Sequence, residues 1–137
     1  MNEQDLLCAA EEARKMAYAP YSGFLVGAAL LTKDGKLYTG CNVENASYGA
    51  TNCAERTAFF KAVSEGARQF AAIAIVGGKG SETQPCPPCG VCRQVMCELC
   101  DPDFRIILDD GATYRTYTLR ELMPLSFGAD TLKKGAR

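Results

Sequence analysis

Cys53-Ala54-Glu55, together with the downstream segment Cys89-Gly90-Val91-Cys92, is the most informative part of this sequence. The two segments supply three potential thiolates and one nearby carboxylate, in a chain that contains no histidine. A structural zinc site is closed by four protein ligands, whereas a catalytic zinc site uses three and leaves the fourth position to water or substrate. Three cysteines beside a glutamate therefore predict a zinc site that takes part in chemistry.

The apolar pattern around these segments predicts helices that alternate with strands. Leu6, Ala10, Ala13 and Ala17 recur at helical spacing, and the turn Lys33-Asp34-Gly35-Lys36 between two apolar runs is typical of a β-hairpin. The expected elements are a helix over about 3–17, strands over 24–31 and 37–43, a helix over 53–66, a strand over 71–76, a helix over 90–100, strands over 104–108 and 114–118, and a helix that begins at the capping box Thr118–Glu121. The predicted order is α-β-β-α-β-α-β-β-α.

Both cysteine segments fall at expected helix starts, with Asn52 as the predicted N-cap of the first one. Exposed backbone NH groups and the partial positive charge at a helix N-terminus lower the pKa of a thiol placed there. Three thiolates on Zn²⁺ still leave a net negative charge, and Arg56 is the natural group to compensate it. Glu55, two residues beyond Cys53, is placed to move protons without binding the metal.

Length and composition predict one domain over residues 1–137, with a flexible tail over about 133–137. The chain carries 15 Lys and Arg against 16 Asp and Glu, for a net charge of -1. This balance argues against a nucleic-acid partner, and no apolar run approaches the roughly 18 residues of a membrane span. Eight cysteines without an export signal favour metal binding or catalysis over disulfides, so we expect a cytoplasmic protein.

Several cysteines allow other interpretations. Cys86-Pro87-Pro88-Cys89 has the same spacing as Cys89-Gly90-Val91-Cys92, but the prolines favour an extended chain at Cys86, so the second pair is preferred. A lone Cys-x-x-Cys is also typical of a redox pair. A structural site from Cys89, Cys92, Cys97 and Cys100 has an unusually short central gap. The remaining cysteines are expected to be small buried side chains: Cys8, Cys41, Cys97 and Cys100.

Four segments carry a resemblance to a known family: Phe24–Ala29, Gly40–Asn45, Cys53–Ala58 and Pro88–Gln94. Together they resemble the small, homotetrameric cytidine deaminases, over about residues 6–127. The zinc motifs alone indicate only the broad superfamily of cytidine and deoxycytidylate deaminases, whereas Asn42-Val43-Glu44-Asn45 indicates the branch that acts on nucleosides.

The resemblance implies a three-layer α/β/α fold of the α/β class with a mixed five-stranded sheet. It implies a hydrolase that acts on the C–N bond of a cyclic amidine and converts cytidine and deoxycytidine to uridine and deoxyuridine, with release of ammonia, in pyrimidine salvage. It also implies one zinc ion per subunit and a homotetramer with active sites at the subunit boundaries.

The same resemblance assigns roles to individual residues. It implies that Cys53, Cys89 and Cys92 ligate zinc, Glu55 shuttles protons, Arg56 binds the ligand thiolates, Asn42 and Glu44 hold ribose hydroxyls, the backbone of Ala54 contacts the pyrimidine, Phe24 packs on the base, and Tyr48 and Phe127 reach a neighbouring subunit's site. The chain departs from the family pattern Ser-Pro-Cys, since Pro87-Pro88-Cys89 stands there with Cys86 before it. The Pro87 carbonyl can still accept from the substrate amino group, but the serine hydroxyl is lost.

Three alternative functions are weighed against this one. A blasticidin-type deaminase shares the zinc motifs, and Glu44 with Asn45 favours cytidine instead. A polynucleotide editor needs a basic groove and typically a histidine ligand, both foreign to this composition. A non-catalytic zinc or redox module leaves Glu55 without a purpose. The carboxylate of Glu44 near the sugar repels a phosphate, so free nucleosides are the expected substrates.

Overall fold

The computed structural model describes residues 1–135, and its elements follow the predicted order. They are α1 (Glu3–Arg14), β1 (Phe24–Thr32), β2 (Leu37–Cys41), the 3-10 helix η1 (Tyr48–Ala50), α2 (Ala54–Ser64), β3 (Phe70–Lys79), α3 (Gly90–Leu99), β4 (Arg105–Asp109), β5 (Tyr114–Thr118), α4 (Leu119–Leu122) and α5 (Ala129–Gly135). The predicted α/β class and order are confirmed, with η1 and α5 as additional elements.

The five strands form one mixed sheet in the order β2-β1-β3-β4-β5. Strand β1 pairs antiparallel with β2 and with β3, whereas β3 and β4 are parallel and β4 and β5 antiparallel. Because β2 and β3 are both antiparallel to β1, they run in the same direction and end at the same edge of the sheet. The helices that follow them, α2 and α3, therefore both begin at that edge.

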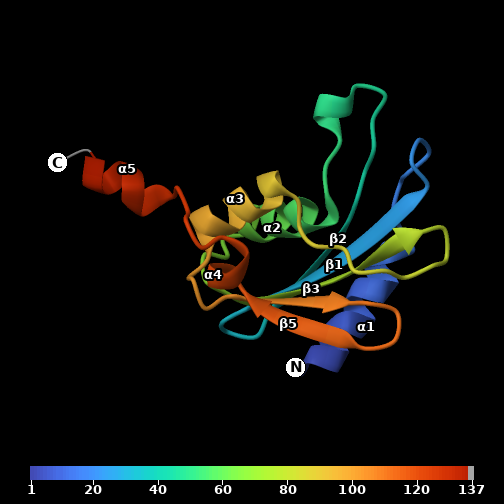
Figure 1. Ribbon diagram of the computed structural model, residues 1–137, viewed down its shortest axis with the longest axis horizontal. Helices are drawn as coiled ribbons and strands as arrows, with labels where there is room; N and C mark the ends of the chain where they lie inside the picture. Colours follow the sequence, from blue (N-terminus) through green and yellow to red (C-terminus); the bar gives the residue numbers. More distant parts are fainter. Residues whose placement is uncertain (136–137) are drawn as a thin grey trace.

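Helices cover both faces of the sheet, which gives three layers (Figure 1). Helix α1 lies on one face over a cluster that includes Leu6, Leu7 and Ala10. Helices α2 and α3 lie on the other face, over a larger cluster that includes Phe59 and Met96. The apolar side chains of each face are thus buried by a different helical layer.

Gly27 of β1 permits the close approach of α1 to the sheet. A Cβ atom at this position would lie 2.0 Å from the carbonyl oxygen of Ala10 and 2.4 Å from the backbone nitrogen of Arg14. No side chain fits at such distances, so glycine lets the helix lie directly on the strand. The last turn of α1 is thereby fixed against β1 and β3.

Several element ends differ from the sequence-based expectation. Helix α1 ends at Arg14, not near residue 17, because the chain turns there into a bridge between Tyr18 and Val43. Strand β3 extends to Lys79 through two glycines, beyond the expected end at residue 76. Capping boxes begin both α1 and α4, the latter as predicted from Thr118 and Glu121.

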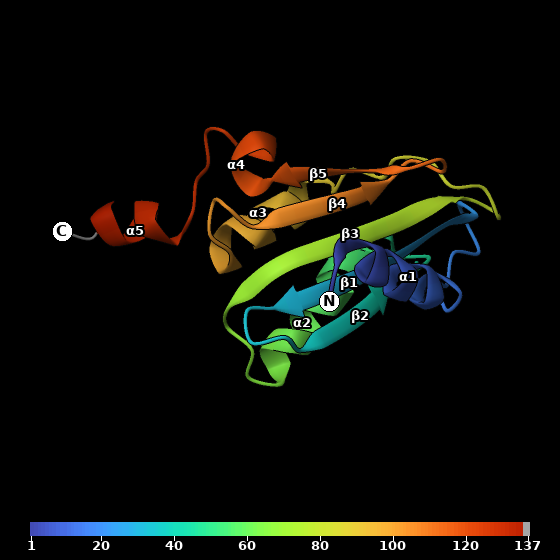
Figure 2. The ribbon, with the colours of Figure 1, turned by 90° about the horizontal axis from the view of Figure 1, so that it is seen from below.

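The carboxyl-terminal segment extends away from the rest of the chain in both views (Figure 2). The expected flexible tail began at Lys133, whereas the structure is helical through Gly135. The remaining part of that expectation, residues 136–137, lies outside the described residues.

Candidate metal centre and active site

Three cysteine side chains converge where α2 and α3 begin. Cys53 is the N-cap of α2, Cys89 is the N-cap of α3, and Cys92 lies in the first turn of α3. Their sulfur atoms all lie within 4.8 Å of one another, and the Cys53 and Cys89 sulfurs are 3.7 Å apart. Zn–S bonds of about 2.3 Å in tetrahedral geometry place two sulfurs roughly 3.8 Å apart. The three thiols therefore fit a zinc ion.

The helix starts leave both N-cap sulfurs available. Neither Cys53 nor Cys89 makes a capping hydrogen bond with its side chain. The prediction of Asn52 as the N-cap of α2 is wrong by one residue, because the Asn52 side chain instead donates to the Thr57 hydroxyl at 3.2 Å. A cysteine thus occupies the N-cap position, where a polar residue that caps the helix is usual. Its sulfur makes no capping hydrogen bond and is free to bind a metal ion.

Arg56 supplies positive charge to this cluster. Its Nη2 atom donates to the Cys53 sulfur at 3.4 Å, while its buried Nε atom has no hydrogen-bond partner among the described residues. A hydrogen bond shared with Cys92, reinforced by Arg56, lowers the pKa of Cys53 to about 5. The same shared bond raises the pKa of Cys92, so the metal-free cluster retains a proton there. The thiolate of Cys53 is therefore favoured at the start of α2.

Glu55 lies in the first turn of α2 with only 5% of its surface exposed. Burial, together with a smaller effect of the neighbouring Cys53 thiolate, raises the pKa of its carboxyl to about 7, against the opposing effects of a backbone hydrogen bond and of Arg56. A carboxyl with a pKa near neutrality can both take up and release a proton under physiological conditions. The environment of Glu55 therefore suits proton transfer.

Gly40 of β2 sets the depth at which α2 lies on the sheet. A Cβ atom on Gly40 would lie 2.7 Å from the Ala54 carbonyl oxygen and 2.6 Å from the Ala58 backbone nitrogen. The first turns of α2 thus rest directly on the backbone of β2. This contact positions Cys53 and Glu55 relative to the strand that leads to Asn42.

Asn42 joins the end of β2 to the start of β1. Its side-chain oxygen accepts from the Val26 backbone at 2.9 Å, and its amide nitrogen donates to the Phe24 carbonyl at 2.8 Å. Val43 pairs with Asn52 through two backbone hydrogen bonds of 3.0 and 2.9 Å. The segment with Asn42 is therefore tied to the residue before Cys53. An amide group also keeps one donor and one acceptor site free for a ligand.

Glu44 lies in a pocket of about 360 Å³ that Tyr48 also lines. Its carboxylate accepts from the backbone nitrogens of Tyr21 and Ser22 at 3.0 and 3.1 Å, and from the Ser22 hydroxyl. The Ser22 hydroxyl contributes most to lowering the pKa of Glu44. The carboxylate is therefore ionised at neutral pH and held in the lining of this pocket.

Tyr48 and Phe127 do not pack into the core of their own chain. Tyr48 is 80% exposed in η1, and Phe127 is 56% exposed in the segment before α5. The Phe127 carbonyl accepts from the Gln94 side chain at 2.6 Å, which ties this segment to α3. Both aromatic side chains are available to another surface.

The remaining cysteines do not join the cluster. Among the residues that the structure describes, only Cys53, Cys89 and Cys92 converge as a possible metal site, so neither Cys86 nor a set with Cys97 and Cys100 replaces them. The buried Cys86 thiol donates to the Gln84 carbonyl at 3.3 Å, and burial raises its pKa to about 11. The expectation of burial is wrong for Cys8, which is exposed, and Cys41, Cys97 and Cys100 are half-buried.

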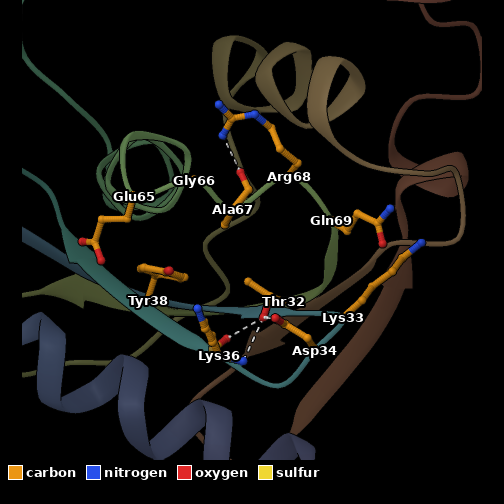
Figure 3. Close-up of a pocket in the computed structure, with 10 residues that line it drawn as sticks. All are labelled: Thr32, Lys33, Asp34, Lys36, Tyr38, Glu65, Gly66, Ala67, Arg68 and Gln69. Atoms are coloured by element: carbon orange, nitrogen blue, oxygen red, sulfur yellow. Dashed lines mark hydrogen bonds between the residues drawn. The ribbon is translucent and has the colours of Figure 1, made fainter.

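A second pocket lies between the β1–β2 turn and the segment that joins α2 to β3 (Figure 3). Several of its polar groups bind one another or the backbone: Thr32 bonds to Asp34 and Lys36, and Arg68 donates to the Ala67 carbonyl at 2.9 Å. The predicted site residues are absent from its lining. This pocket is therefore separate from the metal centre.

Sequence reasoning did not find two residues that hold other segments of the chain in place. The Ser22 hydroxyl donates to the Glu44 carboxylate. In the sequence, Ser22 is only a hydroxyl residue in a segment rich in turn-forming residues, which does not indicate this role. Arg14 is 4% exposed and donates to carbonyls at the end of β3 and in the loop after it. The sequence feature that could have identified Arg14 is its spacing: it follows Ala10 by four positions and so places a charged residue on the apolar face of α1.

None of the described helices is long and apolar enough to cross a membrane.

Comparison with known proteins agrees with the geometry of the metal centre. Residues 1–107 match the model of the cytidine and deoxycytidylate deaminase zinc-binding region. The chain is 52% identical to a cytidine deaminase of Halalkalibacterium halodurans over 133 residues, which cover 96% of this chain and 98% of the relative. It is 47% identical to a cytidine deaminase of Sporosarcina psychrophila over 139 residues, which cover 99% and 98% of the two chains.

The fold is also similar to that of a solved relative. The crystal structure of a cytidine deaminase from Burkholderia pseudomallei superposes with a TM-score of 0.86 at 52% identity, over 93% of this chain and 100% of the other. With three cysteines placed to bind zinc, this chain belongs to the cytidine and deoxycytidylate deaminase family.

Proposed function

We propose that this chain hydrolyses cytidine and deoxycytidine to uridine and deoxyuridine, with release of ammonia. The observation that carries the proposal is the convergence of Cys53, Cys89 and Cys92 at two helix starts, beside the buried carboxyl of Glu55. Similarity to named cytidine deaminases over nearly the whole chain supports the substrate class. The proposal treats residues 1–137 as one catalytic domain.

Cys53, Cys89 and Cys92 hold one zinc ion per chain in this proposal. A zinc ion in such a site lowers the pKa of water and so supplies a nucleophile at neutral pH. Three protein ligands leave a fourth position open, as this role requires. Arg56, which donates to the Cys53 sulfur, offsets the negative charge of the thiolates. The chain thus provides both the ligands and their charge compensation.

Glu55 moves the protons of the reaction. Its carboxylate takes one proton from the attacking water and passes it to N3 of the pyrimidine, then takes the proton of the new C4 hydroxyl and passes it to the departing amino group. The C4–N bond then breaks, a carbonyl forms at C4, and ammonia leaves. The raised pKa of Glu55, about 7, suits a group that accepts and donates in the same cycle.

The nucleoside is held by groups from both sides of the cluster. Phe24 packs on the base, the Ala54 backbone contacts the pyrimidine, and the Pro87 carbonyl accepts from the amino group. Asn42 and Glu44 bind ribose hydroxyls. The ionised carboxylate of Glu44 repels a phosphate, so free nucleosides are preferred over nucleotides.

The active enzyme in this proposal is a homotetramer in which Tyr48 and Phe127 reach a neighbouring subunit's site. Both aromatic side chains are exposed in the single chain, as such a role requires. The free state of all eight cysteines is consistent with a reducing cytoplasm, where the enzyme would serve pyrimidine salvage.

The test combines metal analysis with a substrate panel on the purified full-length chain. We expect about one zinc per chain and a fall in ultraviolet absorbance as cytidine or deoxycytidine is converted, with cytidine monophosphate, blasticidin S and single-stranded RNA converted far more slowly. Chelation of zinc should abolish the conversion. A zinc-loaded chain that leaves cytidine unchanged would overturn the proposal, and preferred conversion of blasticidin S would assign the site to that substrate.

A further inference from the structure

Arg14 is a buried cation with no role in the proposed reaction. It is the last residue of α1 and only 4% exposed. A charged side chain rarely occupies such a position unless its hydrogen bonds are satisfied, because a buried unpaired charge is strongly unfavourable. The groups that bind Arg14 therefore indicate what it does.

The guanidinium of Arg14 binds a single turn of the chain, residues 78–83. Its Nη1 atom donates to the Thr83 hydroxyl at 3.0 Å. Its Nη2 atom lies within hydrogen-bond distance of three backbone carbonyls, those of Gly78 and Gly80 at 3.2 Å each and that of Glu82. These partners are 64 to 69 residues away in the sequence, so the contact is a tertiary one. Arg14 gathers this turn around one fixed cation.

The backbone from which Arg14 projects is itself held in place. A Cβ atom on Gly27 would lie 2.8 Å from the Arg14 Cα atom, so the helix rests directly on β1 at this residue. The carboxylate of Glu11, half-exposed, lies 3.6 Å from Nη1 and adds one ion pair on the solvent side. The backbone of Arg14 is thus fixed against the sheet, and its guanidinium holds the turn by hydrogen bonds.

The turn leads directly to the metal centre. The Gln84 backbone nitrogen donates to the Gly77 carbonyl at 2.8 Å, and the Cys86 thiol donates back to the Gln84 carbonyl at 3.3 Å. A Cβ atom on Gly77 would lie 2.8 Å from the Cys86 sulfur, so the returning chain lies tightly against β3. Pro87 and Pro88 follow and restrict the backbone up to Cys89. A displacement of the turn is therefore passed on to Pro87 and Cys89.

We propose that Arg14 is a positioning residue that holds the Pro87 carbonyl and Cys89 in place by clamping residues 78–83. The consequence for catalysis rests on the proposed function, in which the Pro87 carbonyl accepts a hydrogen bond from the substrate amino group. Uridine lacks that amino group. Loss of the clamp should therefore weaken the recognition and turnover of cytidine more than the binding of uridine.

The clamp itself is tested by amide hydrogen exchange on the zinc-loaded protein. Arg14→Gln and the milder variant Thr83→Val should each speed exchange of the Gln84 amide, by about tenfold for Arg14→Gln, because a charged hydrogen-bonded group has been removed. Amides in the centre of β3, such as Ile73 and Ile75, should be unchanged. Arg14→Lys should restore part of the protection. Glu11→Gln, which removes only the solvent-side ion pair, is the matched control and should resemble the wild type.

The catalytic consequence is tested by kinetics on the same variants. We expect kcat/KM for cytidine to fall about tenfold or more in Arg14→Gln, since small displacements of positioning groups have effects of this size, with the inhibition constant of uridine unchanged. Unaltered exchange at Gln84 in both variants, or an equal acceleration throughout β3, would overturn the clamp. Equal losses for cytidine and uridine would overturn its action through Pro87. A wild type that does not convert cytidine would instead overturn the proposed function, and the exchange data would still decide whether Arg14 holds the turn.

Discussion

Arg56 lies where three cysteine side chains converge, and it supplies positive charge there. Its guanidinium donates to the Cys53 sulfur at 3.4 Å, and removal of its charge leaves the metal site more negative. We expect Arg56→Gln to fold and to bind zinc and turn over cytidine roughly 10-fold less well, as is typical for residues that support metal ligands. Competition with a coloured zinc chelator measures the first effect. The control is Arg68→Gln, which changes an exposed arginine beyond α2. Equal zinc retention in both variants would place the compensating charge elsewhere.

The buried carboxyl of Glu55 should give the metal-free protein a pH-dependent stability. The folded protein binds the Glu55 proton with a pKa of about 7, against 4.5 for an unperturbed carboxyl. Between these values the Glu55 carboxyl holds more protons in the folded state than in the unfolded state, so its contribution to the free energy of unfolding should fall as the pH rises. The total loss should be about 3 kcal/mol.

Urea unfolding of the metal-free protein across this pH range, with Glu55→Gln as the control, isolates the effect of this one carboxyl. The difference in unfolding free energy between the two proteins should change with pH and level off above pH 7. A difference that does not vary with pH would show that Glu55 is solvated in the metal-free chain.

Residue types made part of this site predictable. Cysteines and a glutamate at fixed spacings carry their chemistry in the sequence, and their convergence follows from two helices that start at one sheet edge. Arg14 could not be assigned in this way, because its partners lie 64 to 69 residues away and are mostly backbone carbonyls. Backbone acceptors leave no signature in the side chains.

At the scale of elements, the position of α2 depends on the absence of a side chain at Gly40. We expect Gly40→Ala to displace α2 from β2, because the new methyl group would overlap the backbone of Ala54 and Ala58. Overpacking of this kind costs about 1–3 kcal/mol or more. Zinc affinity should fall together with the thermal midpoint, since Cys53 begins this helix.

The control for this prediction is Gly49→Ala. Gly49 lies in η1, and a Cβ atom there would have no heavy atom within 4 Å. The control should leave both the thermal midpoint and the zinc affinity unchanged. If Gly40→Ala behaves like Gly49→Ala, the close contact between β2 and α2 does not set the site.

The order of elements was predictable, but several of their ends were not. Apolar patterns identified most of the helices and strands, because burial imposes such patterns, and turn and capping signals identified the hairpin and α4. The end of α1 is set by the bridge between Tyr18 and Val43, and the extension of β3 to Lys79 by pairing with Phe24 of β1. Such pairings join distant segments and are not visible in a local pattern.

At the scale of the whole molecule, the exposed aromatic side chains of Tyr48 and Phe127 bear on assembly. We expect native mass spectrometry to find a species of four times the 14.7 kDa chain. Phe127→Ala should lower turnover while zinc binding stays intact, because the proposed contact is with a neighbouring subunit's site. A fully active monomer would contradict the tetramer. Sequence patterns of one chain cannot show an assembly, since the contacts of an assembly lie between chains.

In the proposed reaction, Glu55 transfers protons at a zinc site formed by Cys53, Cys89 and Cys92. The most direct test measures zinc content and cytidine-to-uridine turnover for the wild type and Glu55→Ala side by side. We predict equal zinc in both proteins and a loss of turnover of at least about 100-fold in the variant, the scale of general acid–base catalysis. Near-normal turnover by a zinc-loaded Glu55→Ala protein would contradict the account.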